Sequence, residues 1–167
     1  MMNAPHGSRP PMTVLLVDDD PSTLLICRKI LEEEKFVVLQ AAGSSEALKV
    51  QADHHTPIDL VVTDVLLPPP GFQLSIAGNP FPRVNGQELA DLLLSSKQEL
   101  RIIFISTSSK EDLQARGMIA ANALFLQKPF SVETFRNLVY KALAAPPATR
   151  QSKKGGPASP KEIDWFG

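Results

Sequence analysis

The stretch that decides the fold is residues 14–20, VLLVDDD, in which four apolar residues are followed directly by three aspartates. A second apolar run, residues 60–62, ends in the same way at Thr63 and Asp64. Short continuous apolar runs are typical of strands buried on both faces of a parallel sheet. Carboxylates that follow two such strands can meet at one edge of the sheet, where they repel unless a cation or raised pKa values relieve the repulsion. A hard divalent ion with oxygen ligands would relieve it, and Mg²⁺ is the usual one.

Length and composition indicate one domain with tails. The chain has 167 residues, of which 43% are hydrophobic, enough for a core. With 17 basic and 18 acidic residues its net charge is -1, so no basic face for nucleic-acid binding is expected. The single cysteine, Cys27, lies in an apolar stretch and is expected to be a buried structural thiol. Because no run approaches the roughly 18 apolar residues of a membrane span or resembles a signal peptide, we expect a cytoplasmic protein.

Apolar periodicity predicts five strands that alternate with five helices. The expected strands are residues 13–17, 36–40, 58–63, 101–105 and 123–126. The expected helices are residues 21–34, 43–52, 86–96, 110–120 and 131–144. In the first helix, Pro21 suits the first turn and Asp20 can cap it. Such alternation favours an α/β fold, with a doubly wound five-stranded parallel sheet covered by helices on both faces.

Polar side chains follow four of these strands. The first strand is followed by the aspartates at 18–20, the third by Asp64, the fourth by Ser106, and the fifth closely by Lys128. Right-handed crossovers bring these strand ends to one edge, where ligands of open α/β sheets bind. An aspartate can act as a nucleophile and form an aspartyl-phosphate, while a metal and a lysine offset the charge of the phosphoryl group. The set is therefore a candidate for phosphoryl transfer to a carboxylate.

The order and spacing of these motifs resemble the CheY-like receiver domains of bacterial two-component response regulators. The matching stretches are residues 14–21 (VLLVDDDP), 59–64 (DLVVTD) with Pro68, 103–107 (IFIST) and 128–130 (KPF). The resemblance implies a flavodoxin-like, CheY-like three-layer sandwich with strand order 2-1-3-4-5. It extends over a receiver domain at residues 12–145, between an expected disordered leader at 1–11 and an expected flexible tail at 146–167.

The resemblance also implies the metal and phosphoryl ligands. Asp64 would be the phospho-acceptor, and Asp18 and Asp19 would be the acidic pair that holds Mg²⁺. Asp64 itself and the backbone carbonyl of Leu66 would complete the protein ligands of the ion. Lys128 would pair with the phosphoryl group. These roles describe a phospho-acceptor with self-catalysed phosphotransfer and dephosphorylation rather than an enzyme.

Further positions are matched to the signalling response. Ser106 takes the place of the switch hydroxyl, and Phe125 takes that of the switch aromatic, although Phe125 could equally be plain core. Pro129 would follow a cis peptide bond. Leu66 and Ser108 are the positions expected to tune the lifetime of the phosphoryl group. A homodimer through the face of the fourth helix, fifth strand and fifth helix is left open.

The chain departs from the family pattern at two places. The glycine expected about four residues after Pro68 is matched by Gly86, which implies an insertion of about 14 residues within 69–85, beside the acceptor. The insertion could cover the site, bind a partner or be a mobile excursion. Ala121 stands where the family often has a glycine that ends the fourth helix, and the neighbouring Asn122 could take the left-handed cap conformation instead.

The leading hypothesis is a single-domain response regulator that accepts a phosphoryl group on Asp64 from a histidine kinase or phosphotransfer protein. It would signal through protein contacts without DNA or membrane binding, since no DNA-binding output domain fits after residue 144. One alternative is a phosphorylation-independent scaffold that uses the insertion and the aromatic tail at Trp165 and Phe166, although the tail could instead pack on the receiver or a twin molecule. Another is a Mg²⁺-dependent phosphohydrolase, but Leu66 stands where such enzymes usually carry a second acid.

Overall fold

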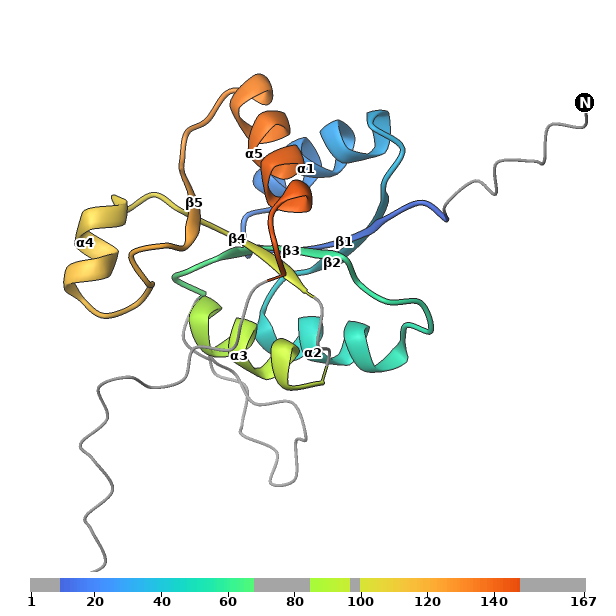
Figure 1. Ribbon diagram of the computed structural model, residues 1–167, viewed down its shortest axis with the longest axis horizontal. Coiled ribbons are helices and arrows are strands. Elements are labelled where there is room, and N and C mark those ends of the chain that lie inside the picture. Colours follow the sequence, from blue (N-terminus) through green and yellow to red (C-terminus); the bar gives the residue numbers. More distant parts are fainter. Residues whose placement is uncertain (1–9, 68–84, 97–99, 148–167) are drawn as a thin grey trace, which may run out of the picture.

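The computed structural model describes residues 10–67, 85–96 and 100–147, which form an α/β sandwich of three layers (Figure 1). Its strands are β1 (Thr13–Val17), β2 (Val37–Ala41), β3 (Leu60–Asp64), β4 (Arg101–Ser106) and β5 (Leu124–Gln127). Its helices are α1 (Pro21–Glu33), α2 (Ser44–Asp53), α3 (Gly86–Ser96), α4 (Lys110–Ala115) and α5 (Val132–Ala144). Nearly all of the expected leader, insertion and tail lies outside the described residues, as do Trp165 and Phe166.

The five strands form one parallel sheet in the order β2-β1-β3-β4-β5, which confirms the predicted fold class and strand order. Strands β1 and β3 are buried along their whole length, as their continuous apolar sequences predict. Val17 is in register with Thr63, and Asp64 is in register with Ile105. The residues that follow β1, β3 and β4 are therefore neighbours at the carboxyl edge of the sheet.

Helices cover both faces of the sheet. Figure 1 shows α1 and α5 on one face and α2 and α3 on the other. On the α1–α5 side, Leu16, Val62 and Phe135 belong to one buried cluster. Cys27 belongs to the same cluster, and its burial, with a smaller effect of the nearby Asp18 charge, raises the pKa of its thiol to about 12. Cys27 is thus a protonated core side chain, as expected.

Hydrogen bonds define the start and the end of α1. Asp20 caps the helix, since its carboxylate accepts a hydrogen bond from the backbone N–H of Ser22 at 2.9 Å, and Pro21 occupies the first turn. The helix ends at Glu33; Lys35 follows with a left-handed φ of 69°, and the N–H of Phe36 donates to the carbonyl of Leu31 at 3.0 Å. This left-handed residue turns the chain into β2.

The fourth helix is shorter than predicted. It ends at Ala115 rather than at residue 120, and Gly117 takes a left-handed conformation with φ of 69°. The N–H of Met118 then donates to the carbonyl of Leu113 at 2.9 Å, as in a glycine-terminated helix. The expectation that Asn122 forms the left-handed cap is therefore wrong, because Gly117 ends the helix earlier. The other bounds differ from the prediction by at most two residues.

Within the described ranges, none of the helices has the length and apolar character that crossing a bilayer requires.

Candidate functional site

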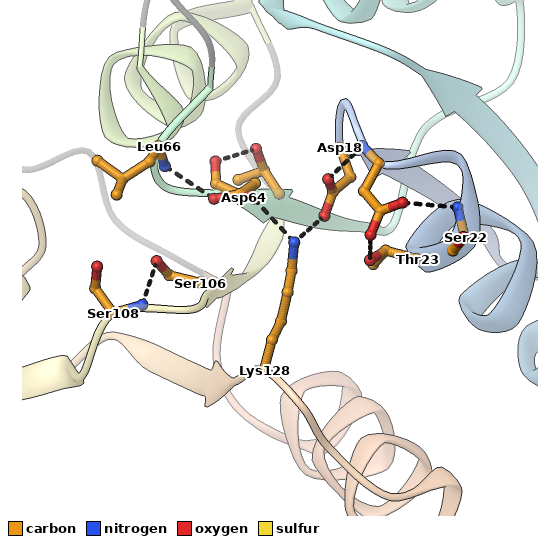
Figure 2. A network of polar contacts seen from close by, with 10 residues as sticks. Asp18, Ser22, Thr23, Asp64, Leu66, Ser106, Ser108 and Lys128 are labelled. Carbon is orange, nitrogen blue, oxygen red and sulfur yellow. Dashed lines mark hydrogen bonds and ion pairs between the residues drawn. The ribbon is translucent and has the colours of Figure 1, made fainter.

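Three carboxylates gather at the carboxyl edge of the sheet. Oxygen atoms of Asp18, Asp19 and Asp64 all lie within 4.8 Å of one another. Asp18 and Asp64 are buried, whereas Asp19 is exposed to solvent. Backbone groups orient the two buried carboxylates: the N–H of Asp20 donates to Asp18 Oδ1, and the N–H of Leu66 donates to Asp64 Oδ1, both at 2.9 Å (Figure 2). The sequence predicted this grouping from the two strand ends.

Lys128 joins the two buried carboxylates. Its ammonium lies 2.6 Å from Asp18 Oδ2 and 3.0 Å from Asp64 Oδ2, and Figure 2 shows the side chain reaching up between them. The backbone N–H of Lys128 donates to the carbonyl of Ser106 at 2.7 Å, which holds the start of the segment between β5 and α5 against β4. The peptide bond between Lys128 and Pro129 is cis.

Burial and pairing set the charges at the site. Burial raises the pKa of Asp18, and the hydrogen bonds from Lys128 and from the N–H of Asp20 offset this only in part. Burial alone would lower the pKa of Lys128, but its hydrogen bonds to Asp18 and Asp64 outweigh that effect and raise it. Lys128 therefore carries its full charge at neutral pH, and of the described residues it is the one ammonium paired with this cluster.

The donor set fits a metal ion. Three carboxylates against one ammonium leave an excess of acidic groups in a partly buried position, which is unfavourable without a further cation. Carboxylate oxygens are the ligands of hard divalent ions, and the three lie close enough to share one. Asp18, Asp19 and Asp64 could therefore hold such an ion.

The predicted switch residues lie on β4, which neighbours β3, and on β5 at the end of the sheet. Ser106 ends β4, one residue beyond the register partner of Asp64, and is fully buried. Its hydroxyl oxygen accepts a hydrogen bond from the backbone N–H of Ser108 at 3.1 Å (Figure 2). Phe125, on β5, is partly buried against the core. Ser106 thus lies at the carboxyl edge, whereas Phe125 is the second residue of β5, in register with Phe104, and the switching roles of both stay predictions.

Gly86 is the site neighbour whose contact the sequence did not reveal. It was matched to a family glycine by spacing alone, but the structure puts its backbone against that of Asp64, and its N–H donates to the carbonyl of Val65 at 3.0 Å. By contrast, His54 and His55 lie between α2 and β3, toward the opposite edge of the sheet, and belong to no metal-binding group among the described residues.

Known proteins resemble most of this chain. Residues 14–140 match the family model described as response regulator receiver domain. Sensor kinase CckA of Brucella abortus (strain 2308) is 30% identical over 132 residues, which cover 78% of this chain and 12% of the kinase. Two-component response regulator ORR21 of Oryza sativa subsp. japonica is 27% identical over 127 residues, which cover 76% of this chain and 16% of that protein. The chain thus spans less than a fifth of the length of these relatives.

Solved structures share the fold. Chemotaxis response regulator CheY4 of Vibrio cholerae aligns with a TM-score of 0.60 at 23% identity, covering 80% of this chain and 99% of that one. A response regulator receiver protein from Sinorhizobium medicae WSM419 aligns with a TM-score of 0.63 at 22% identity, covering 81% and 96%. The structural likeness supports the fold, and the match over residues 14–140 shows the family: the chain belongs to the response regulator receiver domains of two-component systems.

Proposed function

We propose that Asp64 accepts a phosphoryl group in a Mg²⁺-dependent reaction and that the protein thereby acts in a phosphorelay. Membership of the receiver family agrees with phosphorelay signalling in general. The observation that carries the specific proposal is the environment of Asp64. This carboxylate ends a central strand, lies 3.0 Å from the Lys128 ammonium, and shares a cluster with Asp18 and Asp19.

The carboxylate of Asp64 is prepared for attack on phosphorus. The N–H of Leu66 donates to its Oδ1 and the ammonium of Lys128 to its Oδ2, so both oxygens are oriented by hydrogen bonds. In the transfer, a carboxylate oxygen forms a bond to phosphorus while the phosphorus–nitrogen bond of a phosphohistidine breaks and its electron pair returns to the imidazole. The product is an aspartyl-phosphate, whose new negative oxygens Lys128 and the Ser106 hydroxyl would bind.

The acidic cluster would hold the Mg²⁺ ion. Asp18, Asp19 and Asp64 supply carboxylate oxygens, and the backbone carbonyl of Leu66 would complete the protein ligands. When bound, the ion supplies positive charge for the oxygens of the transferred phosphoryl group. The ion would then compensate the carboxylates in place of Lys128. The Lys128 ammonium could therefore turn to the phosphoryl group, and no second lysine would be needed to bind it.

The phosphoryl donor would be a histidine kinase or a phosphotransfer protein. Both a sensor kinase and response regulators are among the relatives, so the similarity does not decide in which kind of protein this receiver works. Signalling through protein contacts in the cytoplasm, a single-domain architecture and a homodimer through the α4–β5–α5 face stay predictions. So does the tuning of the phosphoryl lifetime by Leu66 and Ser108.

The proposal is tested by intact-protein mass spectrometry after incubation with acetyl phosphate and Mg²⁺. We expect an added mass of one phosphoryl group in the wild type, and none with a chelator or in Asp64→Asn. Asp53→Asn is the matched control, since this exposed carboxylate ends α2 and takes no part in the acidic cluster. An adduct of equal yield in Asp64→Asn would contradict the assignment of the acceptor.

A scaffold without phosphorylation is the rival function. Wild-type protein that gains no adduct, under conditions that label another receiver, would favour it. Replacing residues 69–84 by a short Gly-Ser linker then separates two explanations. An adduct that forms only after the replacement would assign the lack of reaction to the insertion, whereas continued absence would indicate that the fold serves as a scaffold.

A further inference from the structure

We infer that Gly86, the first residue of α3, is a positioning residue that holds the Asp64–Leu66 turn in the geometry needed to bind the metal and accept the phosphoryl group. The inference rests on the proposed function of Asp64. It concerns a residue that touches neither the metal nor the phosphoryl group and acts only through the backbone of the acceptor.

Gly86 packs against the backbone of the acceptor with no space for a side chain. A Cβ atom at this position would lie 2.3 Å from the carbonyl oxygen of Asp64, 2.9 Å from Val65 Cα and 3.1 Å from the carbonyl carbon of Asp64. All three are backbone atoms, so rotation of a side chain cannot relieve the overlap. Any larger residue must therefore displace either the start of α3 or the peptide group between Asp64 and Val65.

Hydrogen bonds hold both sides of this contact. On the acceptor side, the N–H of Val65 donates to the carbonyl of Ile105 at 3.0 Å, which ties the turn to β4. On the helix side, the side chain of Asn85 accepts a hydrogen bond from the N–H of Glu88 at 2.8 Å and caps α3. The N–H of Gly86 joins the two sides through the carbonyl of Val65. Because hydrogen bonds restrain both the start of α3 and the Asp64–Val65 peptide, a side chain at position 86 would displace the Asp64–Leu66 turn as well as the helix.

Displacement of the turn would reach two groups of the site at once. The peptide that Gly86 touches leads to Leu66, whose N–H orients Asp64 Oδ1 at 2.9 Å and whose carbonyl is the proposed metal ligand. The other oxygen, Oδ2, is held independently by Lys128 at 3.0 Å. A shift of this peptide would therefore rotate the Asp64 carboxylate about Oδ2, which Lys128 holds in place. It would also move the carbonyl of Leu66, the proposed metal ligand. Both metal affinity and acceptor reactivity depend on such geometry.

The other two described glycines serve as matched controls. A Cβ at Gly43, which precedes α2, would meet nothing within 4 Å. A Cβ at Gly117 would also meet nothing, but its φ of 69° makes alanine strained there. Gly43→Ala therefore controls for the added methyl group, and Gly117→Ala controls for a loss of stability that does not touch the acceptor.

The test compares Gly86→Ala with these two controls in the full chain. Isothermal titration calorimetry gives the Kd for Mg²⁺, thermal unfolding gives stability, and intact mass gives the rate of adduct formation at saturating Mg²⁺. We expect Gly86→Ala to raise the Kd for Mg²⁺ by about tenfold or more, as loss of a group that orients a ligand does. Its rate at saturating Mg²⁺ should fall by as much as about 100-fold, since small misplacements of a reacting group have effects of that size.

The controls decide whether the effect belongs to positioning. Gly117→Ala should lower the melting temperature while the Kd for Mg²⁺ stays at the wild-type value. A wild-type Kd and rate in folded Gly86→Ala would overturn the inference, and so would an equal rise of the Kd in Gly117→Ala. If the wild type binds Mg²⁺ but forms no adduct, the proposed function fails, whereas the comparison of the Kd values still decides the role of Gly86.

A measurement on the wild type covers the case in which Gly86→Ala does not fold. Because the N–H of Gly86 donates to the carbonyl of Val65, its amide resonance should shift during a Mg²⁺ titration with the same Kd as that of Leu66. The Gly117 amide should not move. A Gly86 amide that stays fixed while Leu66 shifts would show that the turn responds to the metal without Gly86, and would overturn the inference.

Discussion

Two clusters of this receiver each pair acidic side chains with a basic one, but they are organised differently. One, the acceptor cluster, joins strand ends at the carboxyl edge of the sheet; the other, the helix cluster, joins α1 to α5. The acceptor cluster consists of Asp18, Asp19, Asp64 and Lys128. The helix cluster consists of Glu34, Arg136 and Tyr140.

The helix cluster is balanced and partly exposed. Arg136 Nε lies 2.8 Å from Glu34 Oε1, and the Tyr140 hydroxyl donates to the same carboxylate. One positive and one negative charge meet, and their side chains remain 37% and 27% exposed. Such a pair needs no further ion and stabilises the contact between two helices only modestly.

The acceptor cluster is unbalanced and more deeply buried. The side chains of Lys128, Asp18 and Asp64 are 14%, 2% and 11% exposed, and acidic groups outnumber the single ammonium. The comparison teaches that the proposed metal site differs from a structural ion pair by combining burial with an unmatched charge. A balanced pair at a helix contact is accounted for by structure alone.

Replacing the positively charged side chain of each cluster should give the largest difference between the two clusters, measured as the free energy of unfolding. Without Mg²⁺, Lys128→Met should lower the free energy of unfolding by about 3 kcal/mol, because two buried carboxylates lose their partner. Arg136→Met should cost less than about 1 kcal/mol, since its pair is partly solvated. Urea denaturation measures both. Mg²⁺ should reduce the loss in Lys128→Met and leave that in Arg136→Met unchanged, and equal losses for the two variants would contradict the distinction.

Removing a carboxylate from each cluster should separate them by metal affinity. Asp19→Asn takes away a proposed ligand, so its Kd for Mg²⁺ should rise at least as much as on loss of an outer-shell partner, about tenfold or more. The rise in melting temperature that Mg²⁺ produces should shrink accordingly. Glu34→Gln is the control and should keep the wild-type Kd. Calorimetric titration of the two variants at one pH provides the measurement, and a wild-type Kd in Asp19→Asn would exclude this residue as a ligand.

The backbone beside the helix cluster offers a smaller, stabilising change. Lys35 follows Glu34 and has a left-handed φ of 69°, which is unfavourable for a residue with a side chain. Lys35→Gly should raise the free energy of unfolding by about 0.5 kcal/mol, the relief of strain being partly cancelled by the greater freedom of the unfolded chain. Denaturation without Mg²⁺ tests this. A decrease in stability would mean that the lysine side chain contributes more than its backbone costs.

The smallest expected effect is a shift in the ionisation of Tyr140, the only tyrosine of the chain. Its hydrogen bond to Glu34, together with slight burial and the charge of that carboxylate, raises its pKa above 10.0. The stabilisation from this bond is therefore complete below pH 10 and is lost as the pH rises through the raised value. Ultraviolet absorbance should show Tyr140 ionising at lower pH in Glu34→Gln. An unchanged titration would show that the bond does not persist in solution.

Much of the fold could be predicted because the strands are locally consistent. The apolar runs before Asp18 and Asp64 fixed two central strands, and their ends placed both carboxylates at one edge. The fourth helix was predicted too long because apolar residues continue beyond Gly117. In the structure this glycine takes the left-handed conformation and the helix ends before it. Lys35 takes a left-handed conformation at the end of α1 although it is not a glycine or asparagine, so its residue type did not predict it.

For the site, the sequence predicted which residue types converge but not how they share contacts. The positions of Asp18, Asp64 and Lys128 after predicted strands indicated that they lie at the same edge of the sheet. The bridging of both carboxylates by one ammonium depends on side-chain geometry, which the sequence does not give. The close contact of Gly86 with the Asp64 backbone joins residues on the two sides of the insertion. Nothing in the local pattern of either segment records it.

The hydrogen bond between Gly86 and Val65 also bears on how long the intervening chain can be. This bond joins the carbonyl of Val65 to the N–H of Gly86 at 3.0 Å between oxygen and nitrogen, so the chain that leaves β3 and the start of α3 meet at the carboxyl edge of the sheet. The entropy lost on closing a flexible loop grows only logarithmically, at about 0.6 kcal/mol for each doubling of its length. A flexible peptide added between Val65 and Gly86 should therefore cost little folding free energy.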